Sequence, residues 1–167
     1  MNTILRAMRL LSIVVWVGGL IFFAFIEAPT AFKVLGTNRQ FALLINWSLA
    51  KTNEVGHLCG FVFILATLAT RYWQAHRSKL LTAQMLLVLL MILTTGYVQA
   101  SIIPAMERDR ATVGGDIAAV PATSPARVDF NRLHALSEKV EGSALFLGLG
   151  VILLMSAEPS GERPLRS

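Results

Sequence analysis

The sequence predicts an all-α integral membrane protein, a four-helix bundle with an interfacial amphipathic helix between helices 1 and 2. Two observations carry this prediction. Of the 167 residues, 54% are hydrophobic and only 15% are charged, whereas soluble domains have about a quarter of their residues charged. In addition, the apolar residues gather in four stretches without charges. Four such stretches leave too little polar surface to cover them in a soluble bundle.

The charge-free stretches cover residues 10–26, 55–70, 80–98 and 142–157. A spanning helix needs about 20 residues, and apolar neighbours extend the shorter stretches to that length. We therefore predict spans at about 8–27, 54–73, 80–99 and 135–157. They form one domain, 1–157, followed by a polar tail, 158–167. The first span is not expected to be a signal peptide. The apolar run of a signal peptide has roughly 7–15 residues, and the run here is longer and is not followed by an A-x-A cleavage site.

Two segments between the spans have distinct characters. Residues 40–51 read QFALLINWSLAK, and their apolar side chains fall near one helical face around Trp47. This pattern predicts an interfacial helix that leads into the second span. Residues 111–129 are rich in Gly, Pro, Ala and Thr, which predicts a flexible loop.

The orientation follows from the lysines and arginines. Arg6, Arg9, Arg71, Arg77 and Lys79 lie in short segments close to the spans, whereas the basic residues of the other side are spread over two long loops. Positive residues near span ends are typical of the cytoplasmic side. We expect both termini in the cytoplasm, including a tail that carries Arg163 and Arg166.

The turns that open the fourth span carry a polar face. At about 100° per residue, His134, Ser137, Glu138 and Glu141 fall within one arc. Asp129 or Asn131 would cap this helix. Imidazole and carboxylate groups one turn apart are able to bind a cation or to relay a proton.

The second span opens in a similar way. Asn53 and His57 share a narrow arc with Glu54 beside it, while Glu27 and Tyr97 lie near the ends of the first and third spans. We expect one outward-facing polar cluster built from all four helices. A metal site there would use His57, His134, Glu138 and Glu141. The alternative is a purely structural role, because polar side chains are common at the interface.

Small residues recur at Gly18-Gly19, Gly56/Gly60 and Ala144/Gly148, and this spacing is typical of close helix packing in membranes. The single cysteine, Cys59, excludes an internal disulfide. We find no basic stripe typical of nucleic-acid binding, and no phosphate loop, HExxH motif or nucleophile elbow. An enzymatic activity is therefore not expected.

Three segments together resemble a known family. They are WVGGLIFFAFIEAPTAF at 16–32, YVQASIIPAMERDR at 97–110 and FNRLHALSEKVEGSALFLGL at 130–149. In this order they are similar to the transmembrane protein 205-like family, which in bacteria is a domain of unknown function. The resemblance implies a four-helix protein of the bacterial inner membrane. The segment around His134 is distantly similar to the copper-resistance protein D-like group and to the haem-containing bacterial protoporphyrinogen oxidase family.

Three hypotheses for function follow. The first is a non-enzymatic inner-membrane protein that handles a metal or small solute at the outward-facing cluster. The second is a haem-binding redox protein that uses His57 and His134. The third is a small transporter or channel subunit, for which the third span offers Gln84, Thr94 and Thr95, with no charge expected deep in any span. The expected partners are the lipid bilayer and either a second copy or another membrane protein.

Overall fold

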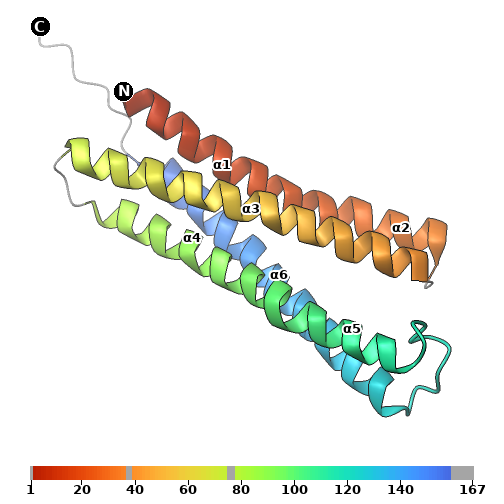
Figure 1. Ribbon diagram of the computed structural model, residues 1–167. Coiled ribbons are helices and arrows are strands. Elements are labelled where there is room, and N and C mark those ends of the chain that lie inside the picture. The colour runs from red at the N-terminus through yellow and green to blue at the C-terminus, as the bar shows by residue number, and fades with distance from the viewer. Residues whose placement is uncertain (1, 37–38, 75–77, 159–167) are drawn as a thin grey trace, which may run out of the picture.

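The computed structural model describes residues 2–36, 39–74 and 78–158, and these residues form long helices with no strand among them (Figure 1). Arg77, Arg163, Arg166 and the rest of the predicted tail after Glu158 lie outside the described residues. The predicted fold class, an all-α membrane bundle, is confirmed. In chain order the elements are α1 (Asn2–Phe22), the π-helix η1 (Phe23–Glu27), α2 (Ala28–Leu35), α3 (Arg39–Gln74), α4 (Lys79–Tyr97), the π-helix η2 (Val98–Ile102), α5 (Ile103–Thr112) and α6 (Pro125–Ser156).

These elements join into four helical stretches that are long and apolar enough to span a membrane: Thr3–Leu35, Arg39–Trp73, Lys79–Thr112 and Pro125–Ser156. A stretch of 33 residues is about 50 Å long at 1.5 Å per residue, whereas the hydrocarbon core is about 30 Å thick. The helices therefore extend well beyond the apolar spans that the sequence predicts.

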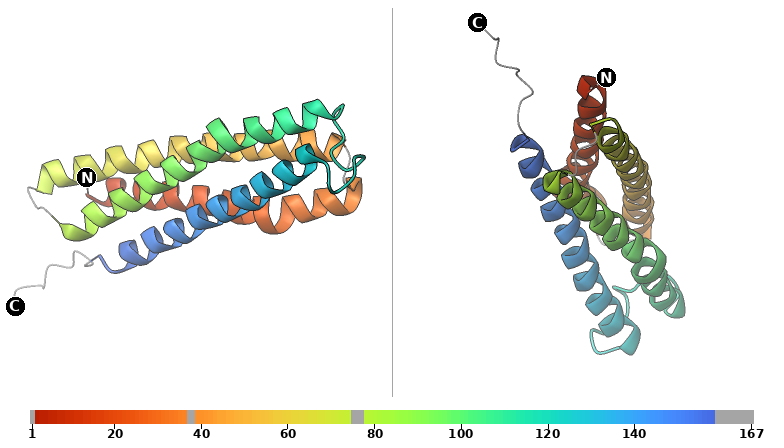
Figure 2. Two further views of the ribbon diagram at one scale, coloured as in Figure 1. Left: turned by 90° about the horizontal axis from the view of Figure 1, so that it is seen from below. Right: turned by 90° about the vertical axis from the view of Figure 1, so that its left-hand side faces the viewer.

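The four stretches alternate in direction and form two hairpins. In the first hairpin, α1 and α2 pack against α3; in the second, α4 and α5 pack against α6 (Figure 2). The start of α1, the end of α3, the start of α4 and the end of α6 lie at one end, here called the termini end (Figure 1). The end of α2, the start of α3 and the loop from α5 to α6 lie at the opposite end, here called the far end. Both ends of the described chain therefore lie on one side of the bundle.

Each hairpin begins with a helix that is interrupted by one π-turn. Pro29 follows η1, and Pro104 follows η2. A proline has no N–H to donate, and its ring clashes with the carbonyl four residues earlier. In both helices that carbonyl belongs to the π-turn, where the bonds run one residue further, from Ala28 to Phe23 and from Ile103 to Val98. The π-turns let both helices continue past their prolines.

Two predicted boundaries are wrong. Residues 40–51 are helical as predicted, but they form the first part of the continuous helix α3 rather than a separate interfacial helix. The last helix begins at Pro125, inside the predicted loop 111–129. Its cap is the Ser124 hydroxyl, which accepts from the Arg127 N–H at 3.3 Å, and not Asp129 or Asn131. Pro125 at the start of α6 supplies a helical φ where the missing N–H is not needed.

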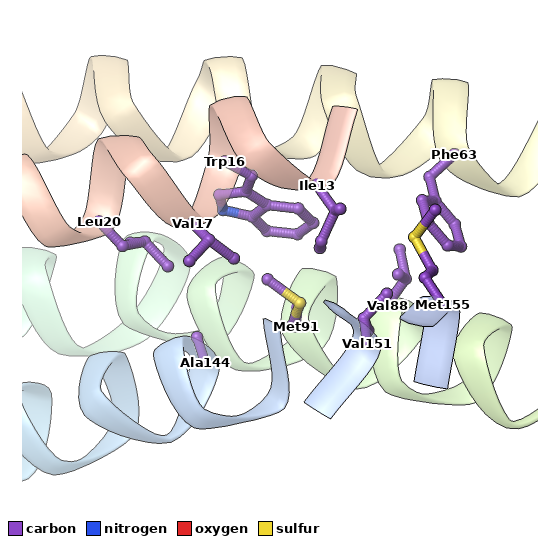
Figure 3. Packing of buried hydrophobic residues seen from close by; sticks show 10 residues of the cluster. All are labelled: Ile13, Trp16, Val17, Leu20, Phe63, Val88, Met91, Ala144, Val151 and Met155. Atoms are coloured by element: carbon purple, nitrogen blue, oxygen red, sulfur yellow. The ribbon is translucent and has the colours of Figure 1, made fainter. Parts of the chain in front are cut away.

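The apolar core lies midway along the bundle, where all four helices meet (Figure 3). The Trp16 indole lies across two glycines of α3, and a Cβ at Gly60 would come within 2.8 Å of that ring. Across the bundle, a Cβ at Gly148 would approach the Met91 methyl to 3.0 Å. The packing role predicted for Gly56, Gly60 and Gly148 is confirmed. Gly18 is exposed and has no such neighbour.

Candidate functional site in the bundle interior

A buried amide and a buried carboxylate pair between the two hairpins. Asn53 of α3 is fully buried, and its Nδ2 donates to Glu141 Oε1 of α6 at 2.9 Å. The other oxygens of this pair, Asn53 Oδ1 and Glu141 Oε2, are also buried, and neither has a hydrogen-bond partner among the described residues. Two acceptors without a partner among the described residues thus lie inside the bundle, where unpaired polar groups are costly.

One helical turn further along α3, His57 contacts α4. Its Nε2 lies 2.9 Å from Thr95 Oγ1, and that hydroxyl also lies 2.8 Å from the Met91 carbonyl. Because a hydroxyl has one proton and the carbonyl can only accept, Thr95 donates to Met91 and accepts from His57. This pattern fits the His57 tautomer that carries its proton on Nε2, and in that tautomer Nδ1 is the acceptor nitrogen.

Trp16 of α1 completes the arrangement. Its indole meets the His57 ring edge to face, with centroids 6.3 Å apart and planes at 79°. The indole is 1% exposed, and its Nε1 has no hydrogen-bond partner in the described part of the chain. We refer to Trp16, Asn53, His57, Thr95 and Glu141 as the central polar cluster. All four helical stretches contribute to it, and among the described residues one buried donor and two buried acceptors of the cluster have no partner.

The remaining predicted residues lie outside this cluster. The Glu27 carboxylate accepts from the Ser48 hydroxyl at the first hairpin. Glu54 is exposed and pairs with Lys51 at 2.5 Å, and Tyr97 is half exposed. Ser137 is buried, but its hydroxyl donates to the His134 carbonyl of its own helix at 2.8 Å.

The proposed metal ligands are not brought together as one group. His134 Nε2 lies 3.4 Å from Glu138 Oε1, but both side chains are more than half exposed. His57 and Glu141 instead take part in the central polar cluster. Among the residues that the structure describes, no group of three or more His, Cys, Asp or Glu side chains is placed to hold a metal ion. The metal set stays a prediction.

A second polar site lies nearer the termini end, where the sequence analysis expects no buried charge. The Arg9 guanidinium is 2% exposed and forms an ion pair with Glu158, which follows α6. Arg9 also donates to Gln84 Oε1 of α4 and lies 5.5 Å from the Phe63 ring centre of α3. This termini-end site thus joins the first three helical stretches and the segment that follows α6.

The sequence contains a signal for this site. Arg9, Ile13, Trp16 and Leu20 recur at intervals of three and four residues, and all four are buried. That spacing defines the core-facing stripe of a helix. Arg9 lies on the stripe and is buried, whereas Arg6, nearly one turn closer to the N-terminus, is exposed.

These features define a multi-pass helical membrane protein with polar side chains enclosed in its bundle. Residues 11–112 match the model of a domain of unknown function, DUF4149. The chain belongs to this family. The comparisons with curated proteins and with solved structures returned no match.

Proposed function

We propose that this integral membrane protein binds a small cation at the central polar cluster. One observation carries the proposal: Glu141 Oε2 and Asn53 Oδ1 are buried in the bundle, and neither has a hydrogen-bond partner in the part of the chain that the structure describes. Both atoms are acceptors, so their unmet bonding capacity calls for a cation or a donor.

The chemistry of the cluster supports a cation. A carboxylate supplies the charge, and an amide oxygen supplies a second hard ligand, which suits ions such as Na⁺, Mg²⁺ or Mn²⁺. Asn53 and His57 lie four residues apart and therefore face the same side of α3. The acceptor nitrogen Nδ1 of His57 extends the choice to Zn²⁺ and similar metals.

The resemblance to the transmembrane protein 205-like family adds a location to this proposal. In it the protein resides in the bacterial inner membrane with its termini end in the cytoplasm, and the cluster is entered from the far end. A haem held by His57 and His134 is less well supported. The His134 ring is stacked on Phe130, with centroids 6.2 Å apart, on the surface, while His57 is engaged by Thr95 inside the bundle.

Cation titration of the purified protein in detergent tests the proposal. Calorimetry with Na⁺, Mg²⁺, Mn²⁺ and Zn²⁺, combined with metal analysis, would measure affinity and content. We expect saturable binding of at least one cation, weakened about tenfold or more by Glu141→Gln, because a charged ligand contributes about 1.5–3 kcal/mol. Glu138→Gln is the matched control, since it removes an exposed carboxylate of the same helix. Absence of binding, or equal loss in both variants, would contradict the proposal.

The wider metal prediction has its own arm in the same experiment. His134→Ala and Glu138→Ala remove the exposed pair, and His57→Ala removes the imidazole of the cluster. If the central polar cluster alone holds the cation, His134→Ala leaves binding unchanged. An absorbance scan of the same preparation for a Soret band tests the haem alternative.

A further inference from the structure

The termini-end site contains more donors than its present partners use. Arg9 directs its two terminal nitrogens to the Glu158 carboxylate, and one of them also reaches Gln84 Oε1. Gln84 Nε2 donates in turn to Glu158 Oε1 at 2.8 Å. The third guanidinium nitrogen, Arg9 Nε, is buried without a partner among the described residues. The carboxylate is thus held by donors from α1 and α4, and one donor is left over.

The occupant of this site comes from outside the helices. Glu158 lies two residues beyond Ser156, the last residue of α6, and its backbone N–H donates to the Met155 carbonyl at 3.2 Å. A carboxylate on such a segment can leave the guanidinium without unwinding a helix. Arg9 and Gln84, by contrast, are 2% and 0% exposed within their helices and are fixed by packing.

We propose that Arg9 and Gln84 form a binding site for an oxyanion group, a carboxylate or a phosphate, and that Glu158 is its tethered occupant. The planar guanidinium fork matches both groups. A buried arginine needs an anion to offset its desolvation, so a solute anion and Glu158 compete for the same donors. The Arg9 guanidinium carbon lies over the Phe63 ring, 5.5 Å from its centre, so the site also has an aromatic neighbour.

This site is independent of the cation site proposed above. It shares no residue with the central polar cluster, and apolar core residues such as Ile13, Val88 and Val151 belong to the layer between them. Failure of one proposal therefore leaves the other standing.

Chemical rescue tests the proposal. Glu158→Ala removes the tethered carboxylate and leaves Arg9 and Gln84 in place. We expect sodium acetate or sodium phosphate, but not sodium chloride at equal ionic strength, to raise the melting temperature of this variant in a saturable manner. In the wild type Glu158 fills the site, and its hydrogen bonds to the charged guanidinium are stronger than bonds between neutral groups. We therefore expect the wild type to need an anion concentration at least about tenfold higher for the same shift.

Two double variants separate the site from general salt effects. Arg9→Gln/Glu158→Ala should no longer gain melting temperature from acetate or phosphate, because it lacks the Arg9 guanidinium that binds the anion. Arg6→Gln/Glu158→Ala should keep it, because Arg6 is an exposed arginine of the same helix. If Glu158→Ala folds poorly, Glu158→Gln preserves the side-chain size and should show the same rescue.

The source of the phosphate is resolved by two arms in phosphate-free detergent. One adds inorganic phosphate, and the other adds phosphatidylglycerol with phosphatidylcholine as its uncharged comparison. A response to inorganic phosphate assigns the site to soluble anions, and a response to phosphatidylglycerol alone assigns it to lipid headgroups. The proposal is overturned by equal shifts in both double variants, by the absence of any shift, or by failure to fold at every anion concentration.

Discussion

The indole of Trp16 fills the space that a side chain at position 56 would occupy. A Cβ added to Gly56 would overlap the indole ring around Nε1. Trp16 is itself buried among residues from all four helices (Figure 3), so the ring has no room to move away. The approach of α1 to α3 therefore depends on the absence of a side chain at this glycine.

Gly56→Ala should consequently destabilise the bundle. Overpacking of a well-packed core costs about 1–3 kcal/mol, which outweighs the gain of about 1 kcal/mol in helix propensity when alanine replaces glycine. Gly18→Ala is the matched control, because Gly18 lies in α1 with nothing within 4 Å of its would-be Cβ. Denaturation in detergent should show a loss for Gly56→Ala and none for Gly18→Ala. Equal effects would mean that the Trp16 contact is not close.

The Asn53–Glu141 hydrogen bond should appear as an energetic coupling between α3 and α6. Interhelical hydrogen bonds in membrane proteins contribute about 0.6 kcal/mol on average and up to about 1.7 kcal/mol. A double-mutant cycle with Asn53→Ala and Glu141→Ala, measured by unfolding in detergent, should give a coupling within this range. The same cycle with Asn53→Ala and Glu138→Ala should be additive, since Glu138 is exposed. Coupling in the control cycle would point to an indirect effect of Asn53→Ala.

The ion pair between Arg9 and Glu158 should be more costly to break than to remove. Loss of one partner of a buried pair destabilises by about 3–5 kcal/mol, because it leaves an uncompensated charge, whereas replacement of both is often close to neutral. Glu158 is 15% exposed, so we expect the lower part of this range. The single variants Arg9→Gln and Glu158→Gln should each be less stable than the double variant. A double variant as unstable as the sum of the two would show that the charges do not interact.

Much of the architecture was predictable because apolar runs report directly on membrane spans. Three of the four predicted spans lie within observed helices, and the fourth ends one residue past Ser156, the last residue of α6. The full lengths of the helices were not predictable in the same way. Residues 40–51 and 125–134 are mixed in polarity, and packing within each hairpin stabilises them as helix. Neither of these two segments contains an apolar run long enough to be recognised as part of a membrane span.

The candidate site was predictable in part. Asn53, His57 and Glu141 were expected in one polar cluster because they begin their apolar spans, and they do lie in the bundle interior. Which of them make contact depends on the rotation of each helix about its axis, and no single helix encodes that rotation. Arg9 was expected at the membrane flank because the first charge-free apolar stretch begins only at Leu10. Its partner, Glu158, lies 149 positions away in the sequence, beyond the reach of any local pattern.

The up-and-down topology predicts that the two ends of the bundle are accessible from opposite sides of a membrane. Cys59 is the only cysteine, so Cys59→Ala gives a background without thiols. Thr3→Cys at the termini end and Thr123→Cys in the loop at the far end replace exposed residues. In sealed vesicles of one orientation, a membrane-impermeant maleimide should label one variant from outside and the other only after the vesicles are opened with detergent.

Ser78→Cys, immediately before α4, should behave like Thr3→Cys, because both lie at the termini end. Labelling of Thr3→Cys and Thr123→Cys from the same side would contradict an arrangement in which each of the first three stretches crosses the membrane. In inside-out vesicles of a bacterial inner membrane, outside labelling of Thr3→Cys would place the termini end in the cytoplasm.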